Sequence, residues 1–509
     1  MKINSATRAQ ITASDARFSS WLTANAGSGK TKVLIDRVAR LLLDGVQPEQ
    51  ILCLTYTKSA AAEMKNRLFD RLGKWAMLAD QELNFSLLGM GIQTQLGIEE
   101  LKKARTLFAR AIEAPGGLKI QTIHAFCSSL LRKFPLEAGI SPQFGELTER
   151  GQRDLYLKVL EILSADEATE ESFEHFSKIA NVSNWEETVS KIVSKRNIFS
   201  KNKSRAEIYE AFSVSSEVSI EDDISSHFQN GTTSFLKKIS DCLQQSTSKV
   251  DQKISKELSK IFSIDLTSLQ LLEKIFLYSK TSKAPFTAKL GKFSTKEMRN
   301  GLLADYIDEI DDLMVRLETF RNRRLSYLAA ETSFSIHKFA SVFLQVYTEQ
   351  KNFKGLLDFD DLINIAVNLL TTSAVADWVL YRLDGGIDHI LVDEAQDTSP
   401  SQWKVIEALA QELTSGQGIK ENRSRTVFVV GDQKQSIYSF QGADPGQFDR
   451  VRDSFSAKLE GAEKTLQIAS LDYSFRSSQT ILALVDKIYE DARAEDFGWG
   501  RKHLAFKSE

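Results

Sequence analysis

Residues 24–31 read Ala24-Asn25-Ala26-Gly27-Ser28-Gly29-Lys30-Thr31 and are the most informative segment of this 509-residue chain. They match the phosphate-binding pattern G-x-x-x-x-G-K-[ST], except that alanine replaces the first glycine. The two glycines let backbone N–H groups close around phosphate oxygens, and a helix beginning next adds the partial positive charge of its N-terminus. The pattern assigns the β- and γ-phosphates to Lys30 and a Mg²⁺ ion to Thr31. Taken alone, the segment leaves open a glycine–serine turn with a chance lysine.

The sequence around this segment predicts an α/β fold. Residues 32–43 and 60–72 carry apolar side chains at helical spacing. Short apolar runs typical of buried strands occur at 51–55, 389–393 and 426–430. Alternating strands and helices indicate a parallel sheet with helices on both faces.

The middle of the chain has a different pattern. Helical periodicity dominates from about residue 141 to about 355, interrupted by stretches rich in serine and lysine. The simplest arrangement is one α/β domain split between residues 1–140 and 356–460, with a mostly helical domain at 141–355 inserted into it.

An acidic pair, Asp393 and Glu394, follows the predicted strand that begins at residue 389. In a parallel sheet this position lies at the carboxyl end of a strand, where ligands bind. A carboxylate there is suited to hold Mg²⁺, and an adjacent glutamate is suited to orient and deprotonate an attacking water. An isolated acidic cluster after a strand is more often a solvated helix cap, so this assignment depends on the phosphate-binding pattern upstream.

Composition limits the class of protein. Apolar residues make up 42% and charged residues 26% of the chain, as in ordinary globular proteins. Lys+Arg 65 against Asp+Glu 68 gives a net charge of −3, so any polyanion must be bound by local patches. No run of about 18 apolar residues is present, and Cys53, Cys127 and Cys242 lie far apart. We therefore expect a cytoplasmic multidomain protein without a membrane partner or a disulfide framework.

Further segments resemble, in order, the motifs of superfamily 1 DNA helicases of the UvrD/RecB type. The similar segments are 55–64 (motif Ia), 120–126 (motif Ib), 358–362 (the return to the first motor domain), 393–397 (motif II), 431–444 (motif III) and 473–477 (motif IV). The forms of motifs III and IV look closest to AddA-type helicase–nuclease subunits. The resemblance implies a RecA-like P-loop NTPase fold and makes residues 461–509 the beginning of a second RecA-like domain.

The resemblance also implies ATP and Mg²⁺ as cofactors and assigns more residues to the nucleotide. Gln10, twenty positions before Lys30, fits the glutamine that reads adenine. Gln435 would sense the γ-phosphate, and Arg476 would stabilise the charge that develops on it. Phe475 would stack on the adenine. For Gln10 an ordinary exposed side chain remains the alternative.

Single-stranded DNA is the polymer that the resemblance implies. The candidate contacts, polar, basic or aromatic residues of motifs Ia, Ib and III, are Thr55, Thr57, Lys58, Thr122, His124 and Phe440. The alternatives are a structural role for His124 and core packing for Phe440. Residues 280–299 of the helical region carry six basic side chains with Phe286 and Phe293 among them, and either a DNA-contacting surface or a solvated face fits that pattern.

Together these features imply the ATP-dependent motor of a 3′→5′ DNA helicase in double-strand break repair. The implied partners are single-stranded or duplex-end DNA and an AddB-like nuclease subunit. No segment resembling motifs V and VI follows Arg476, so we expect an N-terminal fragment that binds nucleotide weakly and turns it over slowly. The alternatives are a non-catalytic, ATP-gated DNA-binding module and a UvrD-type repair helicase without a nuclease partner.

Overall fold

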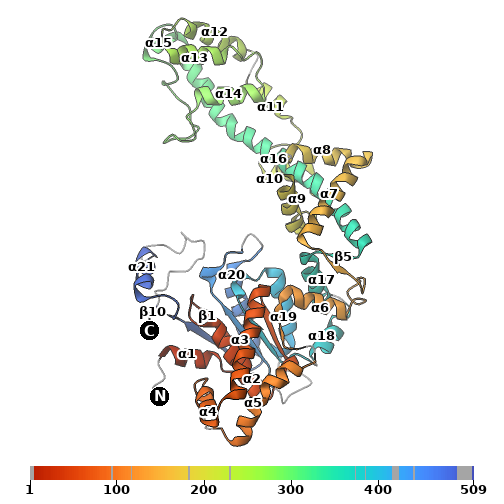
Figure 1. Ribbon diagram of the computed structural model, residues 1–509. Coiled ribbons are helices and arrows are strands. Elements are labelled where there is room, and N and C mark those ends of the chain that lie inside the picture. Colours follow the sequence, from red (N-terminus) through yellow and green to blue (C-terminus); the bar gives the residue numbers. More distant parts are fainter. Residues whose placement is uncertain are drawn as a thin grey trace. The chain divides into compact units, whose positions relative to one another are not determined.

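The computed structural model describes residues 5–92, 96–115, 117–180, 184–228, 231–372, 374–384, 386–414, 424–438, 442–489 and 507–508. The chain forms two compact units. Unit 1 comprises Met1–Thr148 and Lys351–Glu509, and unit 2 comprises Glu149–Gln350. Figure 1 shows unit 1 as strands covered by helices and unit 2 as an assembly of helices.

A six-stranded parallel sheet forms the centre of unit 1. Its strands, in spatial order, are β3 (Lys119–Thr122), β2 (Ile51–Thr55), β6 (His389–Val392), β7 (Thr426–Gly431), β1 (Ser19–Ala24) and β8 (Leu466–Leu471). Every pairing between these strands is parallel. Parallel neighbours need crossover connections, which helices supply. The predicted parallel α/β architecture is therefore confirmed, and strands from both ends of the chain pair within the sheet.

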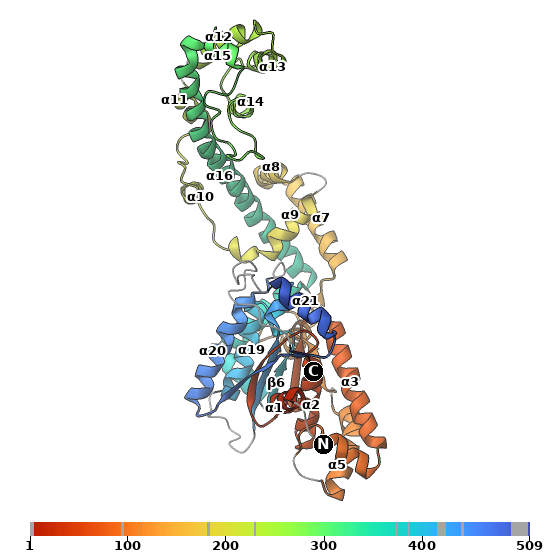
Figure 2. The ribbon, with the colours of Figure 1, turned by 90° about the vertical axis from the view of Figure 1, so that its left-hand side faces the viewer.

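Two hydrophobic cores cover the two faces of this sheet. Leu52 and Leu54 face one core, which is completed by α6 (Ile123–Lys133), α17 (Phe359–Thr371), α19 (Pro400–Thr414) and α20 (Pro445–Gly461). Ile51 and Cys53 face the other, which is completed by α2 (Lys30–Leu43), α3 (Lys58–Met77), α4 (Asp80–Leu88) and α5 (Ile98–Glu113). Figure 2 shows α19 and α20 on one side of the strands and α3 and α5 on the other. Because alternate residues enter opposite cores, a central strand must be apolar throughout.

Strand β8 belongs to the same sheet as the phosphate-binding segment. It pairs with β1 from Ser19 opposite Leu466 to Ala24 opposite Leu471. We expected residues 461–509 to open a second domain, and for β8 this expectation is corrected, because backbone hydrogen bonds to β1 make it the edge strand of unit 1. The chain after β8 continues into β9 (Tyr473–Ser474), which pairs with β10 (Lys507–Ser508), and into α21 (Gln479–Tyr489).

The described residues of unit 2 are predominantly helical. Its shorter helices are α7 (Glu149–Ala165), α8 (Glu170–Ile179), α9 (Trp185–Ser194), α10 (Arg205–Ala211), α11 (Ile220–His227), α12 (Thr232–Gln244), α13 (Lys249–Leu258), α14 (Leu266–Phe276) and α15 (Lys296–Asn300). The 48-residue helix α16 (Ile307–Lys354) packs through its first part against α11 to α14 in one core. Two small strands in unit 1, β4 (Gly145–Glu146) and β5 (Leu356–Leu357), pair near the points where the chain leaves and re-enters that unit.

The basic segment at 280–299 is folded onto the core of unit 2. Phe293 is buried in that core, and the Arg321 guanidinium lies 3.7 Å from the centroid of the Phe286 ring. Lys289 Nζ donates to the Ile275 carbonyl at 2.6 Å, near the end of α14. Burial therefore removes Phe293 as a stacking surface for DNA, while the partly exposed Phe286 ring is already in contact with Arg321. Four lysines of the segment remain exposed: Lys280, Lys283, Lys292 and Lys296. They are compatible both with a DNA-contacting surface and with a solvated face.

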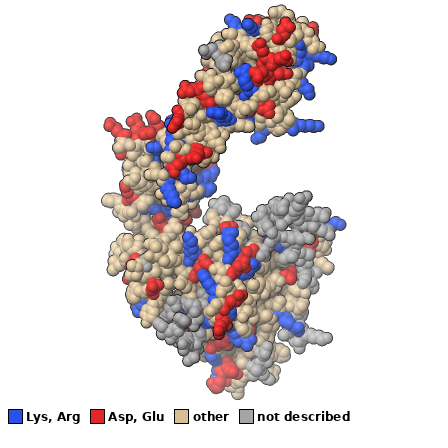
Figure 3. Space-filling model, turned by 180° about the vertical axis from the view of Figure 1, so that it is seen from behind, with Lys and Arg blue, Asp and Glu red and all other residues tan. Residues whose placement is uncertain are grey.

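Charged side chains of both signs are interspersed over the face of the molecule shown in Figure 3, in keeping with the net charge of −3. In the described part of the chain, no single helix has the length and apolarity of a membrane span. Helix α17 meets that measure only together with Ala376–Leu383 of α18 (Ala376–Asp384), at a bend of 98°.

Candidate nucleotide-binding site

The phosphate-binding segment forms the loop between β1 and α2. Gly27 and Gly29 have φ angles of 73° and 88°, in the left-handed region that glycine adopts without strain. Gly29 is the N-cap of α2, so Lys30 and Thr31 lie in the first turn of this helix. A glycine N-cap supplies no side chain to the first N–H groups, and the helix dipole points its positive end at the loop. The loop therefore has the backbone geometry of an anion site.

Asp393 and Glu394 meet this loop directly after β6. Lys30 Nζ lies 3.2 Å from Glu394 Oε2, although 364 positions separate the two residues. Asp393 is buried, and its Oδ1 accepts from the Glu394 backbone N–H at 3.0 Å. Burial, and after it the neighbouring Glu394 carboxylate, raise the pKa of Asp393 to about 7, while Lys30 opposes this shift. The parallel strand order explains the convergence, because all strands of the sheet end at the same edge.

Glu394 has a strained backbone. Its φ of 50° and ψ of 45° are left-handed, in a residue that has a Cβ. For a residue other than glycine this conformation costs roughly 1–2 kcal/mol. The short helical turn η5 (Ala395–Asp397) follows at once, with Glu394 as its N-cap. Strain of this kind persists where surrounding contacts fix the residue, and it is common at functional sites.

Gln396 links the acidic pair to the segment after β7. Its Nε2 donates to Glu394 Oε2 at 2.8 Å, and its Oε1 accepts from the Asp432 backbone N–H at 2.8 Å. Asp432 Oδ2 in turn accepts from Gln435 Nε2 at 2.5 Å. A continuous series of hydrogen bonds thus runs from Lys30 to Gln435. Gln396 was assigned no role from the sequence; the available signal was an amide two positions after the predicted catalytic glutamate.

An aromatic pair lies beside this network. The rings of Tyr56, at the end of β2, and Tyr438, after β7, have centroids 4.6 Å apart and are tilted by 42°. Burial, with a further contribution from the Asp397 carboxylate, raises the pKa of Tyr56 to about 12. Burial and the Glu394 carboxylate raise the pKa of Asp397 to about 6. Both tyrosines are half-buried, so neither is a simple core residue, and Tyr56 was not singled out from the sequence.

The segment after β8 runs alongside the phosphate-binding loop. The Phe475 backbone N–H donates to the Gly27 carbonyl at 2.9 Å. A Cβ placed on Gly27 would lie 2.5 Å from the Arg476 Cβ, which explains why glycine is needed there. The Phe475 side chain is 48% exposed and Arg476 is also exposed. The two residues predicted to contact the nucleotide from motif IV therefore lie next to the loop.

Gln10, on α1 (Ser5–Ala13), packs onto the other side of the loop. It is 4% exposed, which excludes the alternative of an ordinary exposed side chain. Its Nε2 donates to the Ser28 carbonyl at 2.9 Å, and its Oε1 accepts from Lys32 Nζ at 2.7 Å.

The polar residues predicted to contact DNA divide into two groups. Thr55 is fully buried, and its hydroxyl donates to the Thr57 carbonyl at 3.1 Å. Thr122 is 6% exposed, and its Oγ1 accepts from the Ala125 backbone N–H at 3.2 Å as the N-cap of α6. The direct phosphate contacts expected from these two threonines are corrected to a role in shaping the strand–helix junctions, because both side chains are enclosed and bonded to the backbone.

The remaining candidates stay accessible in part. Thr57 and Lys58 are exposed at the carboxyl end of β2, where Thr57 is the N-cap of α3. His124 packs edge-on against Phe359 with ring centroids 5.4 Å apart. Burial lowers the pKa of His124, against the opposing effect of Glu146. Phe440 lies outside the described residues.

The side chains predicted to hold Mg²⁺ are Thr31 and Asp393. Among the described residues, no group of three or more His, Cys, Asp or Glu side chains could hold a metal ion. One hydroxyl and one carboxylate fit Mg²⁺ all the same, because this ion takes few protein ligands and completes its shell with phosphate oxygens and water.

Comparison with known proteins identifies the family to which the sequence is similar. Residues 3–456 match the family profile described as the UvrD/REP helicase N-terminal domain. The chain is similar to an ATP-dependent helicase/nuclease subunit of Lactobacillus acidophilus, with 24% identity over 508 residues, covering 94% of this chain and 39% of that protein. The protein of the same name from Enterococcus faecalis is 26% identical over 512 residues, covering 94% and 37%. The exonuclease/helicase subunit RexA of Lactococcus lactis is 24% identical over 519 residues, covering 94% and 39%. The chain thus spans about two fifths of the length of these relatives.

Proposed function

Because the chain belongs to the UvrD/REP helicase family, we propose that it is the ATP-hydrolysing motor portion of a DNA helicase with a RecA-like core. The observation that supports this most directly is the 3.2 Å contact between Lys30 and Glu394, which joins a phosphate-binding loop to an acidic strand end 364 positions away. A single nucleotide bound at this edge of the sheet would reach both groups.

MgATP supplies the phosphoanhydride bond whose hydrolysis powers such a motor. Lys30 and the N–H groups of the loop would bind the β- and γ-phosphates, and Thr31 and Asp393 would hold the metal. When nucleotide binds, Lys30 exchanges the Glu394 carboxylate for phosphate oxygens. Glu394, released from its ion pair, orients the attacking water and accepts its proton.

The network around Gln396 supports a link between hydrolysis and DNA. Gln435 responds to the γ-phosphate, and its bond to Asp432 connects it to the backbone that leads to Tyr438. Tyr438 and Tyr56 offer stacking faces, and Lys58 offers a charge for a DNA phosphate at the same edge of the sheet. The 3′→5′ direction is proposed from the resemblance of the motifs.

The names of the relatives support a setting in DNA repair. They combine helicase with nuclease or exonuclease, and each is called a subunit. We propose that this chain acts in the cytoplasm on broken DNA ends, together with a nuclease subunit of the AddB type.

The test compares Glu394→Gln and Lys30→Ala with the wild type. Glu394→Gln keeps the shape of the side chain but removes the base, so ATP binding should persist while hydrolysis falls by about 100-fold or more. Lys30→Ala should lose binding itself. Glu99→Gln, on the exposed surface of α5, is the matched control and should behave as wild type. ATP binding and hydrolysis are measured with and without single-stranded DNA.

Two outcomes would contradict the proposal. Hydrolysis that Glu394→Gln leaves intact would place the base elsewhere. A wild type that binds ATP and DNA without hydrolysis under any condition would identify a non-catalytic, ATP-gated binding module.

A further inference from the structure

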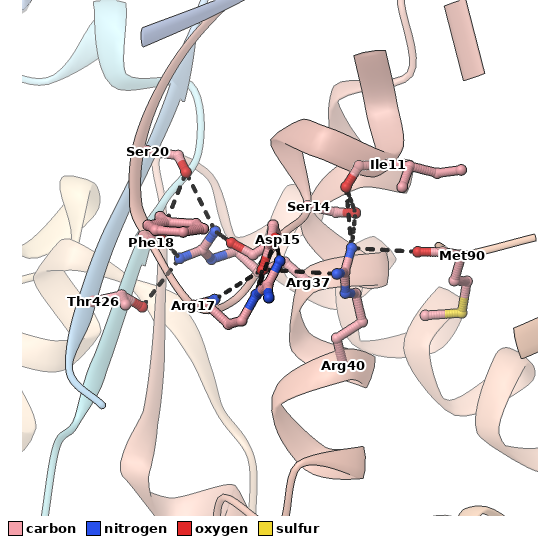
Figure 4. A network of polar contacts seen from close by, with 10 residues as sticks. All are labelled: Ile11, Ser14, Asp15, Arg17, Phe18, Ser20, Arg37, Arg40, Met90 and Thr426. Carbon is pink, nitrogen blue, oxygen red and sulfur yellow. Dashed lines mark hydrogen bonds and ion pairs between the residues drawn. The ribbon is translucent and has the colours of Figure 1, made fainter. Parts of the chain in front are cut away.

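Two arginines of α2 anchor the end of α1 and the connection from α1 to β1 (Figure 4). Arg40 Nη1 donates to the Ile11 carbonyl at 3.0 Å. Arg37, fully buried, donates to the carbonyls of Asp15 at 2.6 Å and Phe18 at 2.5 Å. Hydrogen bonds from charged donors are the strong ones, so these contacts fix α1 against α2. These contacts are to backbone carbonyls of α1 and of the connection after it, and none of them involves the Gln10 side chain.

Lys32, in the first turn of α2, contacts the Gln10 side chain instead. Its ammonium donates to Gln10 Oε1 at 2.7 Å, while Gln10 Nε2 donates to the Ser28 carbonyl at 2.9 Å. The oxygen and nitrogen of a glutamine amide have nearly the same shape, so its orientation must be inferred from its partners. Here the partners leave one choice. An ammonium only donates and a carbonyl only accepts, so Oε1 faces Lys32 and Nε2 faces Ser28.

The oriented amide keeps capacity for a ligand. A glutamine side chain has two N–H bonds and two oxygen lone pairs, and the two contacts use one of each. One donor and one acceptor remain. Adenine presents a matching pair, the amino group at its position 6 beside the N7 acceptor, whereas guanine presents two acceptors, O6 and N7. Gln10 also lies over the loop itself, since a Cβ on Gly29 would come within 2.7 Å of its Nε2.

We propose that Lys32 is a positioning residue that sets the base specificity of the nucleotide site by fixing the Gln10 amide in the orientation that adenine requires. This inference rests on the nucleotide site of the proposed function. An amide flipped by 180° would place its N–H against the adenine amino group and its oxygen against N7, and both contacts would be repulsive. For guanine, each orientation makes one favourable and one unfavourable contact. Fixing the amide therefore favours ATP without improving GTP.

The experiment measures the dissociation constants of ribose-labelled fluorescent ATP and GTP analogues for the whole chain. In Lys32→Met the lost positive charge weakens both nucleotides by a similar factor. The ratio of the two dissociation constants reports on the orientation of the Gln10 amide. We expect the preference for ATP over GTP to fall by about three- to tenfold. Lys32→Arg keeps a cationic donor and should retain much of the preference. Arg40→Gln is the matched control: it loosens the anchoring of α1, should lower thermal stability, and should keep the ATP/GTP ratio.

The outcomes separate this inference from the proposed function. A wild type that binds neither nucleotide would overturn the nucleotide site itself. A wild type that binds ATP and GTP equally, or a Lys32→Met variant with the wild-type ratio, would overturn only the role of Lys32. Loss of the ratio in Arg40→Gln to the same extent as in Lys32→Met would also overturn it, since the effect would then belong to the placement of α1 as a whole.

Discussion

Each unit contains a cluster of charged side chains, and the two clusters are built differently. In unit 2, Glu273 accepts from Arg324 Nε at 2.8 Å and Nη2 at 2.9 Å, with Arg321 Nε at 3.5 Å, and its side chain is 13% exposed. In unit 1, Glu394 pairs with Lys30 at 3.2 Å from a strained backbone, and its side chain is 34% exposed. The first cluster is enclosed by protein partners. The second lies at the open edge of the sheet, where a ligand can replace one partner.

The largest expected effect comes from breaking the enclosed charge cluster around Glu273 in unit 2. Glu273→Ala leaves two arginines in the interior of unit 2 without their counter-charge, which should destabilise α14 and α16 by about 3–5 kcal/mol. Hydrogen exchange followed by mass spectrometry measures this as loss of amide protection in the two helices. ATP binding should stay unchanged.

Glu187→Gln is the control for this variant. Glu187 pairs with Lys191 at 2.6 Å on the surface of the same unit, with both side chains more than half exposed, so exchange should not change measurably. Protection of α14 that survives Glu273→Ala would show that the cluster does not hold unit 2 together.

A buried histidine in the sheet of unit 1 gives the second prediction. Burial, and then the nearby Arg37, lower the pKa of His389 to about 3. Arg37 donates to Thr426 Oγ1 at 3.0 Å, and the same hydroxyl is hydrogen-bonded to His389 Nδ1 at 2.8 Å. With a pKa of about 3, the buried ring is neutral. Unfolding lets the ring take up a proton near its ordinary pKa of about 6.5, so this group's contribution to stability is complete above that pH and is lost as the pH falls toward 3. At pH 5 the loss is about 2 kcal/mol.

The measurement compares urea unfolding of the wild type and His389→Asn at pH 7.5 and pH 5 by tryptophan fluorescence, to which the stacked pair Trp21 and Trp403 of unit 1 contributes. Asparagine keeps both a donor and an acceptor for Thr426 but does not titrate. The wild type should lose more stability than the variant on acidification, and the difference isolates His389 from the carboxyl groups that titrate nearby. Equal losses in the two proteins would contradict a neutral buried ring.

Much of unit 1 was predictable because its signals are local. A continuous apolar run such as residues 51–55 identifies a central strand whatever its partners are, and the glycines at 27 and 29 identify a loop by their backbone requirements. The pairing of β8 with β1 was missed, because strands far apart in sequence carry no local mark of which sheet they join. The domain boundary expected at residue 461 was based on the resemblance to a sequence motif, which does not show which strands are hydrogen-bonded.

Side-chain partners were harder to predict than strands. Gln10 alone is an unremarkable polar residue, and its significance depends on Lys32, 22 positions away, and on the Ser28 carbonyl. Thr55 and Phe293 have the residue types of DNA contacts, yet burial decides their roles, and burial depends on how whole helices pack. The sequence was therefore enough to locate the candidate site. The partner of each side chain could be identified only from the folded structure.

Gln396→Leu should have the smallest effect of these variants. It tests whether the Glu394 network, unlike the Glu273 cluster, does more than stabilise its unit. Leucine fills a similar volume but severs the bonds from Glu394 to Asp432, so the nucleotide end and the Gln435 end of the network should become independent. A lost hydrogen-bond connection of this kind is worth about 1–2 kcal/mol, or roughly tenfold in turnover. The stimulation of hydrolysis by single-stranded DNA should fall while ATP affinity stays near that of the wild type.

Gln433→Leu is the matched change in the same segment, because that amide bonds to Asp449 at 2.9 Å instead of to the acidic pair. It should leave DNA stimulation intact. If Gln396→Leu kept full stimulation, the hydrogen bonds between β6 and β7 would be structural, as those around Glu273 are in unit 2. Signal transfer would then have to pass through the Tyr56–Tyr438 contact. A Tyr56→Leu variant, which removes the ring and keeps an apolar side chain, would distinguish that route by losing stimulation where Gln396→Leu did not.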